Sequence, residues 1–176
     1  MVLLITGASH TGKTLLAQRL LQTYRCPCLS MDLLKMGLIR SGNTRLTPED
    51  DRELESYLWP IVREIIKTAI ENRQDLIVEG CYIPATWADD LTDAKRSHIH
   101  CLFLLFSARY LDVHREAIQA HACCIEQRAD DAIDWAELLR DNRRLLAEVK
   151  RAGASDLLID EAYPDEKTLL AAIQQA

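Results

Sequence analysis

The stretch GASHTGKT, residues 7–14, decides how the rest of the chain is interpreted. An apolar run over residues 2–6 precedes it and predicts a buried strand, and the amphipathic pattern over residues 14–24 predicts a helix. Every defined position matches the pattern G-x-x-x-x-G-K-[ST], in the strand–loop–helix context that this pattern requires. We therefore expect a phosphate-binding loop made by Gly7, Ala8, Ser9, His10, Thr11, Gly12, Lys13 and Thr14.

The residue types of this loop suit a polyphosphate ligand. Gly7 and Gly12 allow the backbone to wrap closely around phosphate oxygens. The amides of residues 9–14 are expected to point inward, and the helix N-terminus adds about half a positive charge. Lys13 would reach the β- and γ-phosphates, the Thr14 hydroxyl would ligate Mg²⁺, and His10 would contribute only its amide. The motif thus predicts binding of a nucleoside triphosphate such as ATP with Mg²⁺, but does not say what is done with it.

Short apolar runs alternate with longer helical patterns along the chain. The runs predict strands over residues 2–6, 28–31, 76–79, 99–106 and 156–159. The other patterns predict helices over residues 14–24, 33–39, about 48–73, 110–128, 135–151 and 164–174. In the third helix, Thr47 is expected to cap the start and Pro60 to break or kink it after Leu58. Strands separated by such crossovers form a parallel sheet with helices on both faces, so we expect one α/β domain over residues 1–176.

Composition narrows the class of protein. The chain has 176 residues, of which 48% are hydrophobic and 27% charged, which fits one domain with a sizeable core. Its net charge of −6 argues against broad binding to nucleic acid or to an anionic membrane. The N-terminus has no basic leader, and the strongest later apolar run, residues 101–106, is too short to cross a bilayer. We expect a cytoplasmic protein, with monomer and homodimer both open.

Polar residues follow the predicted strands, where ligands of an open α/β sheet bind. Asp32, after the second strand, could accept a proton from an acceptor hydroxyl or hold a metal-bound water. Capping of the helix that starts at Leu33 would explain the same residue, and the two roles are compatible. Glu79, after the third strand, could order the magnesium shell or bind a substrate hydroxyl. Pairing with a nearby cation is its alternative.

Arginines complete the candidate set. Arg40 and Arg45 flank a turn after the Asp32 helix and could hold an anionic acceptor by bidentate contacts. Arg128, at the junction of two long helices, could close over ATP as part of a lid. We place an acceptor-binding flap at about residues 38–60 and the lid at about residues 115–135. For each arginine, a solvated position on a helix face is the alternative.

Taken together, GASHTGKT, the SMD segment and LIVEGCYIP resemble the small P-loop kinases, the group that holds adenylate, gluconate and shikimate kinases. Within it, SMD and the VEG-plus-proline segment are most similar to the 2-phosphoglycerate kinase and zeta-toxin-like branch. The resemblance implies a three-layer fold with a five-stranded parallel sheet in the order 2-3-1-4-5, ATP and Mg²⁺ as donor, and a lid between strands four and five. It also implies roles for Lys13 and Thr14 at the phosphates and metal, Asp32 as the base, and Arg128 in the lid.

Two departures from the family pattern affect the substrate. The lid lacks the closely spaced arginine pair common in nucleoside monophosphate kinases, and the third strand ends in Glu79 rather than Asp. Our leading hypothesis is a kinase that transfers the γ-phosphate of ATP to a hydroxyl of a small metabolite. The alternatives are a nucleoside monophosphate kinase, which would hardly need Asp32, and a regulatory ATPase without a small-molecule acceptor.

Overall fold

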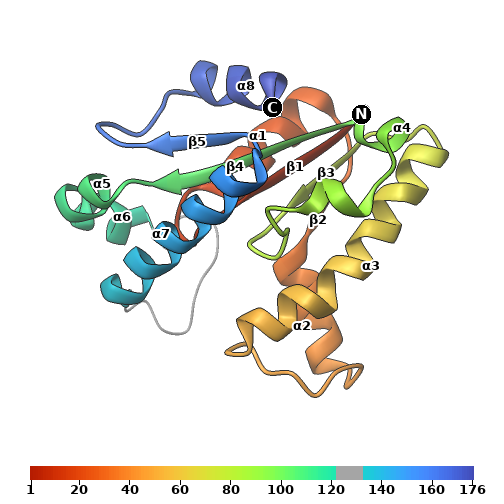
Figure 1. Ribbon diagram of the computed structural model, residues 1–176, viewed down its shortest axis with the longest axis horizontal. Coiled ribbons are helices and arrows are strands. Elements are labelled where there is room, and N and C mark those ends of the chain that lie inside the picture. Colours follow the sequence, from red (N-terminus) through yellow and green to blue (C-terminus); the bar gives the residue numbers. More distant parts are fainter. Residues whose placement is uncertain (122–132) are drawn as a thin grey trace.

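The computed structural model describes residues 1–121 and 133–176, in which strands and helices alternate (Figure 1). The strands are β1 (Val2–Gly7), β2 (Cys28–Ser30), β3 (Leu76–Glu79), β4 (Ile99–Phe106) and β5 (Asp156–Ile159). The helices are α1 (Lys13–Tyr24), α2 (Met31–Arg40), α3 (Asp51–Glu71), α4 (Asp93–Arg96), α5 (Ala108–Val113), α6 (Arg115–His121), α7 (Trp135–Ala152) and α8 (Glu166–Gln175), with a short 3₁₀ turn, η1 (Trp87–Asp90).

The strands form a five-stranded sheet in the order β2-β3-β1-β4-β5, and every pair is parallel. This confirms the order that the resemblance implies. The central strand β1 pairs with β3 on one side and β4 on the other. Glu79 at the end of β3 is level with Ile5 of β1 and Ser30 of β2. Because the strands run the same way, the loop after β1, the start of α2 and the end of β3 meet at one edge.

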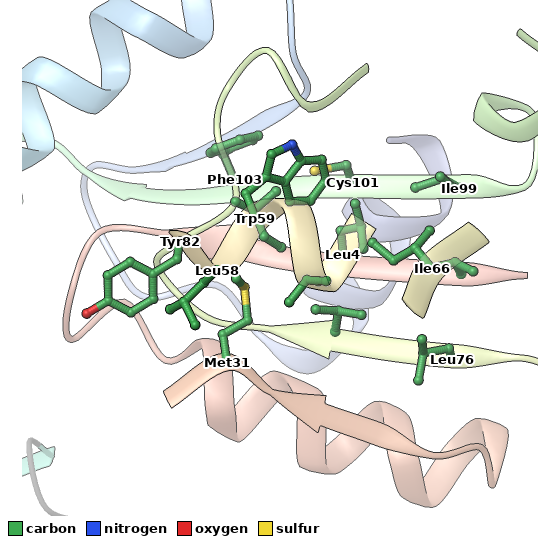
Figure 2. Close-up of a cluster of buried hydrophobic side chains, with 14 of the residues drawn as sticks. Leu4, Met31, Leu58, Trp59, Ile66, Leu76, Tyr82, Ile99, Cys101 and Phe103 are labelled. Atoms are coloured by element: carbon green, nitrogen blue, oxygen red, sulfur yellow. The ribbon is translucent and has the colours of Figure 1, made fainter. Parts of the chain in front are cut away.

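Helices cover both faces of the sheet. On one face Leu4 belongs to an apolar cluster with residues of α3 and α7, part of which Figure 2 shows. On the other face Leu3 and Ile5 belong to a cluster with residues of α1 and α8. All of β1 is buried, as expected for a central parallel strand. The predicted three-layer α/β architecture is confirmed.

The expected break at Pro60 is wrong, because α3 runs without interruption from Asp51 to Glu71. Pro60 lies on the exposed side of this helix, while Leu58, Val62 and Ile66 are buried in the core. Proline has no amide hydrogen to donate, so one carbonyl of the helix lacks its usual hydrogen bond. Because this occurs on the exposed side of the helix, water can bind that carbonyl instead. Burial of the opposite face keeps the helix continuous.

Two other helix boundaries differ from the expectation. Thr47 does not cap α3, since its amide and hydroxyl donate instead to Asp50 Oδ2, at 2.7 and 3.0 Å, in a local turn before the helix starts. Such side-chain bonds compete with helix formation. The helix expected over residues 110–128 is divided at His114 into α5 and α6, and its last part lies outside the described residues. Among the helices in residues 1–121 and 133–176, none has the length and apolar character needed to span a membrane.

Candidate functional site

The loop between β1 and α1 has a backbone that only its glycines allow. Gly7 has φ +130°, and a Cβ there would lie 2.0 Å from the carbonyl oxygen of Leu104. Gly12, the residue before α1, has φ +82°, and His10 also lies in the left-handed region at φ +64°. These positive φ values bend the loop tightly between strand and helix. The sequence pattern therefore forms the turn that it predicts.

The amides of this loop are available to an anion. The Ala8 amide donates to Leu104 O at 3.2 Å, which anchors the loop to β4. Within the described part of the chain, the amides of Ser9, Gly12 and Thr14 donate no hydrogen bond to protein. Amides without protein partners, in a loop that leads directly into a 12-residue helix, suit phosphate oxygens.

Lys13 lies inside the loop rather than in solvent. Its side chain is buried, and Nζ donates to the carbonyl of Ala8 at 2.7 Å. The buried Thr11 hydroxyl donates to the same carbonyl at 2.8 Å. No carboxylate of the described residues lies within ion-pair distance of Lys13. An ammonium held by one neutral carbonyl is well placed to bind a phosphate group.

Thr14 and Glu79 meet at the base of the loop. The Thr14 hydroxyl donates to Glu79 Oε2 at 3.1 Å, and Glu79 is only 2% exposed. Burial raises the pKa of Glu79, while the Ser30 hydroxyl, the charge of Lys13 and the Thr14 bond oppose the rise. Glu79 Oε1 is buried and has no hydrogen-bond partner among residues 1–121 and 133–176. An unpartnered carboxylate oxygen beside a threonine hydroxyl fits Mg²⁺, which prefers oxygen ligands.

Asp32 lies in the first turn of α2, close enough to Glu79 for its charge to raise the pKa of that residue. The helix starts at Met31 with Ser30 before it, so the alternative explanation of Asp32, that it caps a helix starting at Leu33, is wrong. The described contact of Asp32 is instead an ion pair between Oδ1 and Lys35 Nζ at 2.9 Å. The side chain is 35% exposed and lines a large cavity.

A single cavity of about 1560 Å³ brings most of the predicted residues together. It is larger than a typical small-molecule site and has room for a nucleotide and a second compound. Its lining includes Gly7, Ala8, Ser9, His10, Gly12, Lys13, Thr14 and Asp32. Thr11 is buried beneath the loop, and Glu79 lies behind Thr14.

Two of the predicted arginines do not line this cavity. Arg40 and Arg45 are exposed and do not line it, so their contact with an acceptor stays a prediction. Arg128 and part of the predicted lid lie outside the described residues. Ser107, at the end of β4, caps α5 by accepting a hydrogen bond from the Tyr110 amide at 2.9 Å.

Several lining residues were missed by sequence reasoning. Tyr163, from the loop before α8, donates to Thr11 O at 3.0 Å and approaches Gly12 so closely that a Cβ there would lie 2.2 Å from its hydroxyl. Lys35 and Tyr82 bond to each other at 3.0 Å beside Asp32. Only the spacing of Asp32 and Lys35, three apart on a helix, was readable in the sequence. Tyr82 and Tyr163 reach the site through tertiary contacts.

Farther along the cavity, charged side chains of α3 and α7 face each other. Glu55 of α3 has a raised pKa because of burial and the nearby charge of Glu148, which the charge of Arg144 opposes. Arg144 in turn pairs with Glu148 at 3.3 Å and with Asp141 at 3.7 Å on its own helix. This end of the cavity is therefore polar, with groups that can bind hydroxyls.

No protein-family model matches the sequence, and no curated protein is significantly similar to it. Solved structures do share its fold. A candidate kinase from Chloroflexus aurantiacus has a TM-score of 0.60 at 21% identity, with 99% of this chain and 96% of that chain covered. A gluconokinase from Sinorhizobium meliloti 1021 has a TM-score of 0.58 at 16% identity, covering 99% and 91%.

A shikimate kinase from Aquifex aeolicus has a TM-score of 0.52 at 14% identity, with 99% of this chain and 95% of that chain covered. At these identities the likeness shows the fold alone, and it extends over nearly the whole chain. The expected resemblance to small P-loop kinases is thus supported at the level of architecture. The finer resemblance to the 2-phosphoglycerate kinase and zeta-toxin-like branch stays a prediction.

Proposed function

We propose that this protein is an ATP-dependent kinase that phosphorylates a hydroxyl group of a small molecule. One observation carries the proposal: the phosphate-binding loop with Lys13 and Thr14 opens into the same cavity as the carboxylate of Asp32. A triphosphate on the loop and a hydroxyl on Asp32 would share one enclosure. The folds of a gluconokinase and a shikimate kinase support this class of reaction.

The residues of the site have different roles in phosphoryl transfer. The loop amides and Lys13 bind the phosphates and offset the charge that develops during transfer. Asp32 orients the acceptor hydroxyl and takes its proton as the oxygen attacks the γ-phosphorus. The new O–P bond forms as the bond to the β–γ bridging oxygen breaks, and ADP leaves.

Mg²⁺ would be held by Thr14, with Glu79 ordering its shell, and when bound it would neutralise charge on the β- and γ-phosphates. Arg40 and Arg45 on the flap over residues 38–60, and Arg128 in the lid over residues 115–135, remain proposed contacts to acceptor and phosphate. A kinase using Mg²⁺ and ATP would act in the cytoplasm.

The test is a screen for ADP release from Mg-ATP by the purified protein, coupled to a spectrophotometric readout. The acceptors include gluconate, shikimate, hexoses, polyols and amino sugars, with AMP and CMP as a separate set. A many-fold increase with one hydroxyl compound supports the proposal. An increase with AMP or CMP alone would favour a nucleoside monophosphate kinase, and slow turnover indifferent to every small molecule would favour a regulatory ATPase.

A further inference from the structure

A chain of one ion pair and two hydrogen bonds joins Asp32 to the start of α3 along the cavity wall. Lys35 Nζ contacts Asp32 Oδ1 at 2.9 Å and donates to the Tyr82 hydroxyl oxygen at 3.0 Å. The Tyr82 hydroxyl donates in turn to Asp51 Oδ1 at 2.9 Å. The chain thus connects α2, the loop after β3 and the first residue of α3, and all four residues line the cavity.

Tyr82 anchors this chain in the core. Tyr82 is 5% exposed and belongs to the apolar cluster beneath α3, and Figure 2 shows its hydroxyl oxygen pointing away from the cluster. The Lys35 side chain is 13% exposed, with Nζ 5.0 Å from the centroid of the Tyr82 ring. Lys35 is therefore held in place by a rigid residue rather than by a mobile surface group.

The donors and acceptors of the chain are satisfied together in one protonation state, with Lys35 charged and Tyr82 neutral. Burial opposes the charge of Lys35, but its bonds to Tyr82 and Asp32 outweigh this and raise its pKa. Burial raises the pKa of Tyr82, which keeps the hydroxyl protonated as a donor to Asp51 even though Lys35 opposes the rise. Both carboxylates are then acceptors only.

We infer that Lys35 and Tyr82 are positioning residues that fix the orientation of Asp32 for proton transfer. Lys35 occupies Oδ1, and among the described residues no hydrogen bond is donated to Oδ2, so that oxygen is the one presented to an acceptor hydroxyl. The inference rests on the proposed function, because it needs Asp32 to receive the proton. Such orientation matters because a displacement of about 1 Å can lower a rate by about 10².

A surface pair in the same protein shows what an ordinary contact of this spacing looks like. Lys67 and Glu64 on α3 are also three residues apart and 2.8 Å from each other. Glu64 is exposed, and neither residue lines the cavity. Lys67→Met is therefore a matched control for Lys35→Met. Tyr24, whose hydroxyl accepts from Gln174 Nε2 at 3.1 Å outside the cavity, gives the control Tyr24→Phe for Tyr82→Phe.

The experiment measures ADP release from Mg-ATP with water as acceptor and with the most active hydroxyl compound of the screen. Lys35→Met and Tyr82→Phe should each lower kcat about tenfold or more while KM for Mg-ATP stays unchanged. Lys35→Arg keeps the charge and several donors, and should recover part of the loss. The two control variants should match the wild type.

A double variant separates positioning from a structural effect. In the Asp32→Asn background, Lys35→Met should lower kcat no further, because the residue acts through Asp32. The inference would be overturned if Asp32→Asn inactivates the enzyme while Lys35→Met and Tyr82→Phe keep the full wild-type kcat. The proposed function would still stand in that case. Additive losses in the double variant would also overturn it. A wild type that neither binds Mg-ATP nor releases ADP would instead remove the proposed function itself.

Discussion

Lys13 carries its ammonium group into a buried position where its only described hydrogen bond goes to one backbone carbonyl. A buried ammonium group with no carboxylate of the described residues within ion-pair distance is costly, and a phosphate group would relieve that cost. Asp32, at the same cavity, is the opposite case, a carboxylate already paired with Lys35. The site therefore has an ammonium group, on Lys13, that can bind an anion, and a carboxylate, on Asp32, that can accept a hydrogen bond from a hydroxyl.

Replacing Lys13 with alanine should abolish transfer and weaken binding of Mg-ATP, since the loop loses its charged contact to the phosphates. The fold should remain, because the side chain is not part of either apolar cluster beside the sheet. Thermal shift makes this measurable, since a ligand at 100 times its Kd stabilises the native state by about 2.7 kcal/mol. If Mg-ATP raises the Tm of Lys13→Ala as much as it raises that of the wild type, the assigned site is refuted.

Asp32→Asn distinguishes the acceptor classes. The amide cannot take a proton, so a hydroxyl kinase should lose a factor of ~10² or more in kcat. A nucleoside monophosphate kinase, whose acceptor is already an anion, should keep most of its activity. Measuring kcat of Asp32→Asn with the hydroxyl acceptor found in the screen and with AMP distinguishes the two classes of kinase. The affinity of the variant for Mg-ATP should equal that of the wild type, which serves as the control.

At the scale of elements, the phosphate-binding loop depends on how closely β1 and β4 approach. Gly7 is in the left-handed region of φ and in contact with the backbone of Leu104, so neither sterics nor conformation allows a side chain. Gly37, on α2, has no heavy atom within 4 Å of where its Cβ would be. The same substitution should therefore have opposite effects at the two sites.

Gly7→Ala should destabilise the protein by about 2 kcal/mol or more, because backbone atoms that cannot rotate away must shift. Gly37→Ala should stabilise it by about 0.4–1 kcal/mol, through higher helix propensity and a less flexible unfolded chain. Urea unfolding of both variants and the wild type measures the difference. Equal midpoints for the two variants would contradict the geometry of the loop.

At the scale of the whole molecule, the buried Glu79 makes stability depend on pH. Its pKa is raised in the folded state, chiefly by burial, so the folded protein holds this proton more tightly than the unfolded chain. The resulting stabilisation is present below pH 4.5, the ordinary pKa of a glutamate, and is lost as pH rises through the raised folded value. A charged Glu79 therefore lowers the stability of the protein at neutral pH.

Glu79→Gln should unfold at a higher urea concentration than the wild type at pH 7, and its stability should fall less between about pH 4.5 and pH 7. If Glu79 orders Mg²⁺, the same variant should need more Mg²⁺ for activity. Glu49→Gln, at an exposed position, serves as the control. Identical pH dependence of wild type and Glu79→Gln would show that Glu79 does not titrate differently on folding.

Much of this protein could be predicted because its strongest signals are local. The loop is defined by eight consecutive residues, and the strands are apolar runs whose burial follows from composition alone. The prediction of a helix break at Pro60 was wrong because burial of Leu58 and Val62 keeps the helix continuous. The prediction of a cap at Thr47 was wrong because Thr47 forms a turn with Asp50 instead. Arg40 and Arg45, chosen for their type and nearness to Asp32 in sequence, are exposed and lie away from the cavity.

Local sequence patterns are enough to predict the strand–loop–helix unit and the alternation of strands and helices. They also identify the residues that could bind phosphate or accept a proton. A parallel sheet then required the ends of β1, β2 and β3 to share one edge, which is why Asp32 and Glu79 could be placed near the loop. The spacing of Asp32 and Lys35 on one helix was readable in the sequence, but the hydrogen bonds from Lys35 to Tyr82 and from Tyr82 to Asp51 come from the tertiary structure alone. Those contacts join segments up to 47 residues apart, and no local pattern encodes them, because they depend on how the helices pack on the sheet.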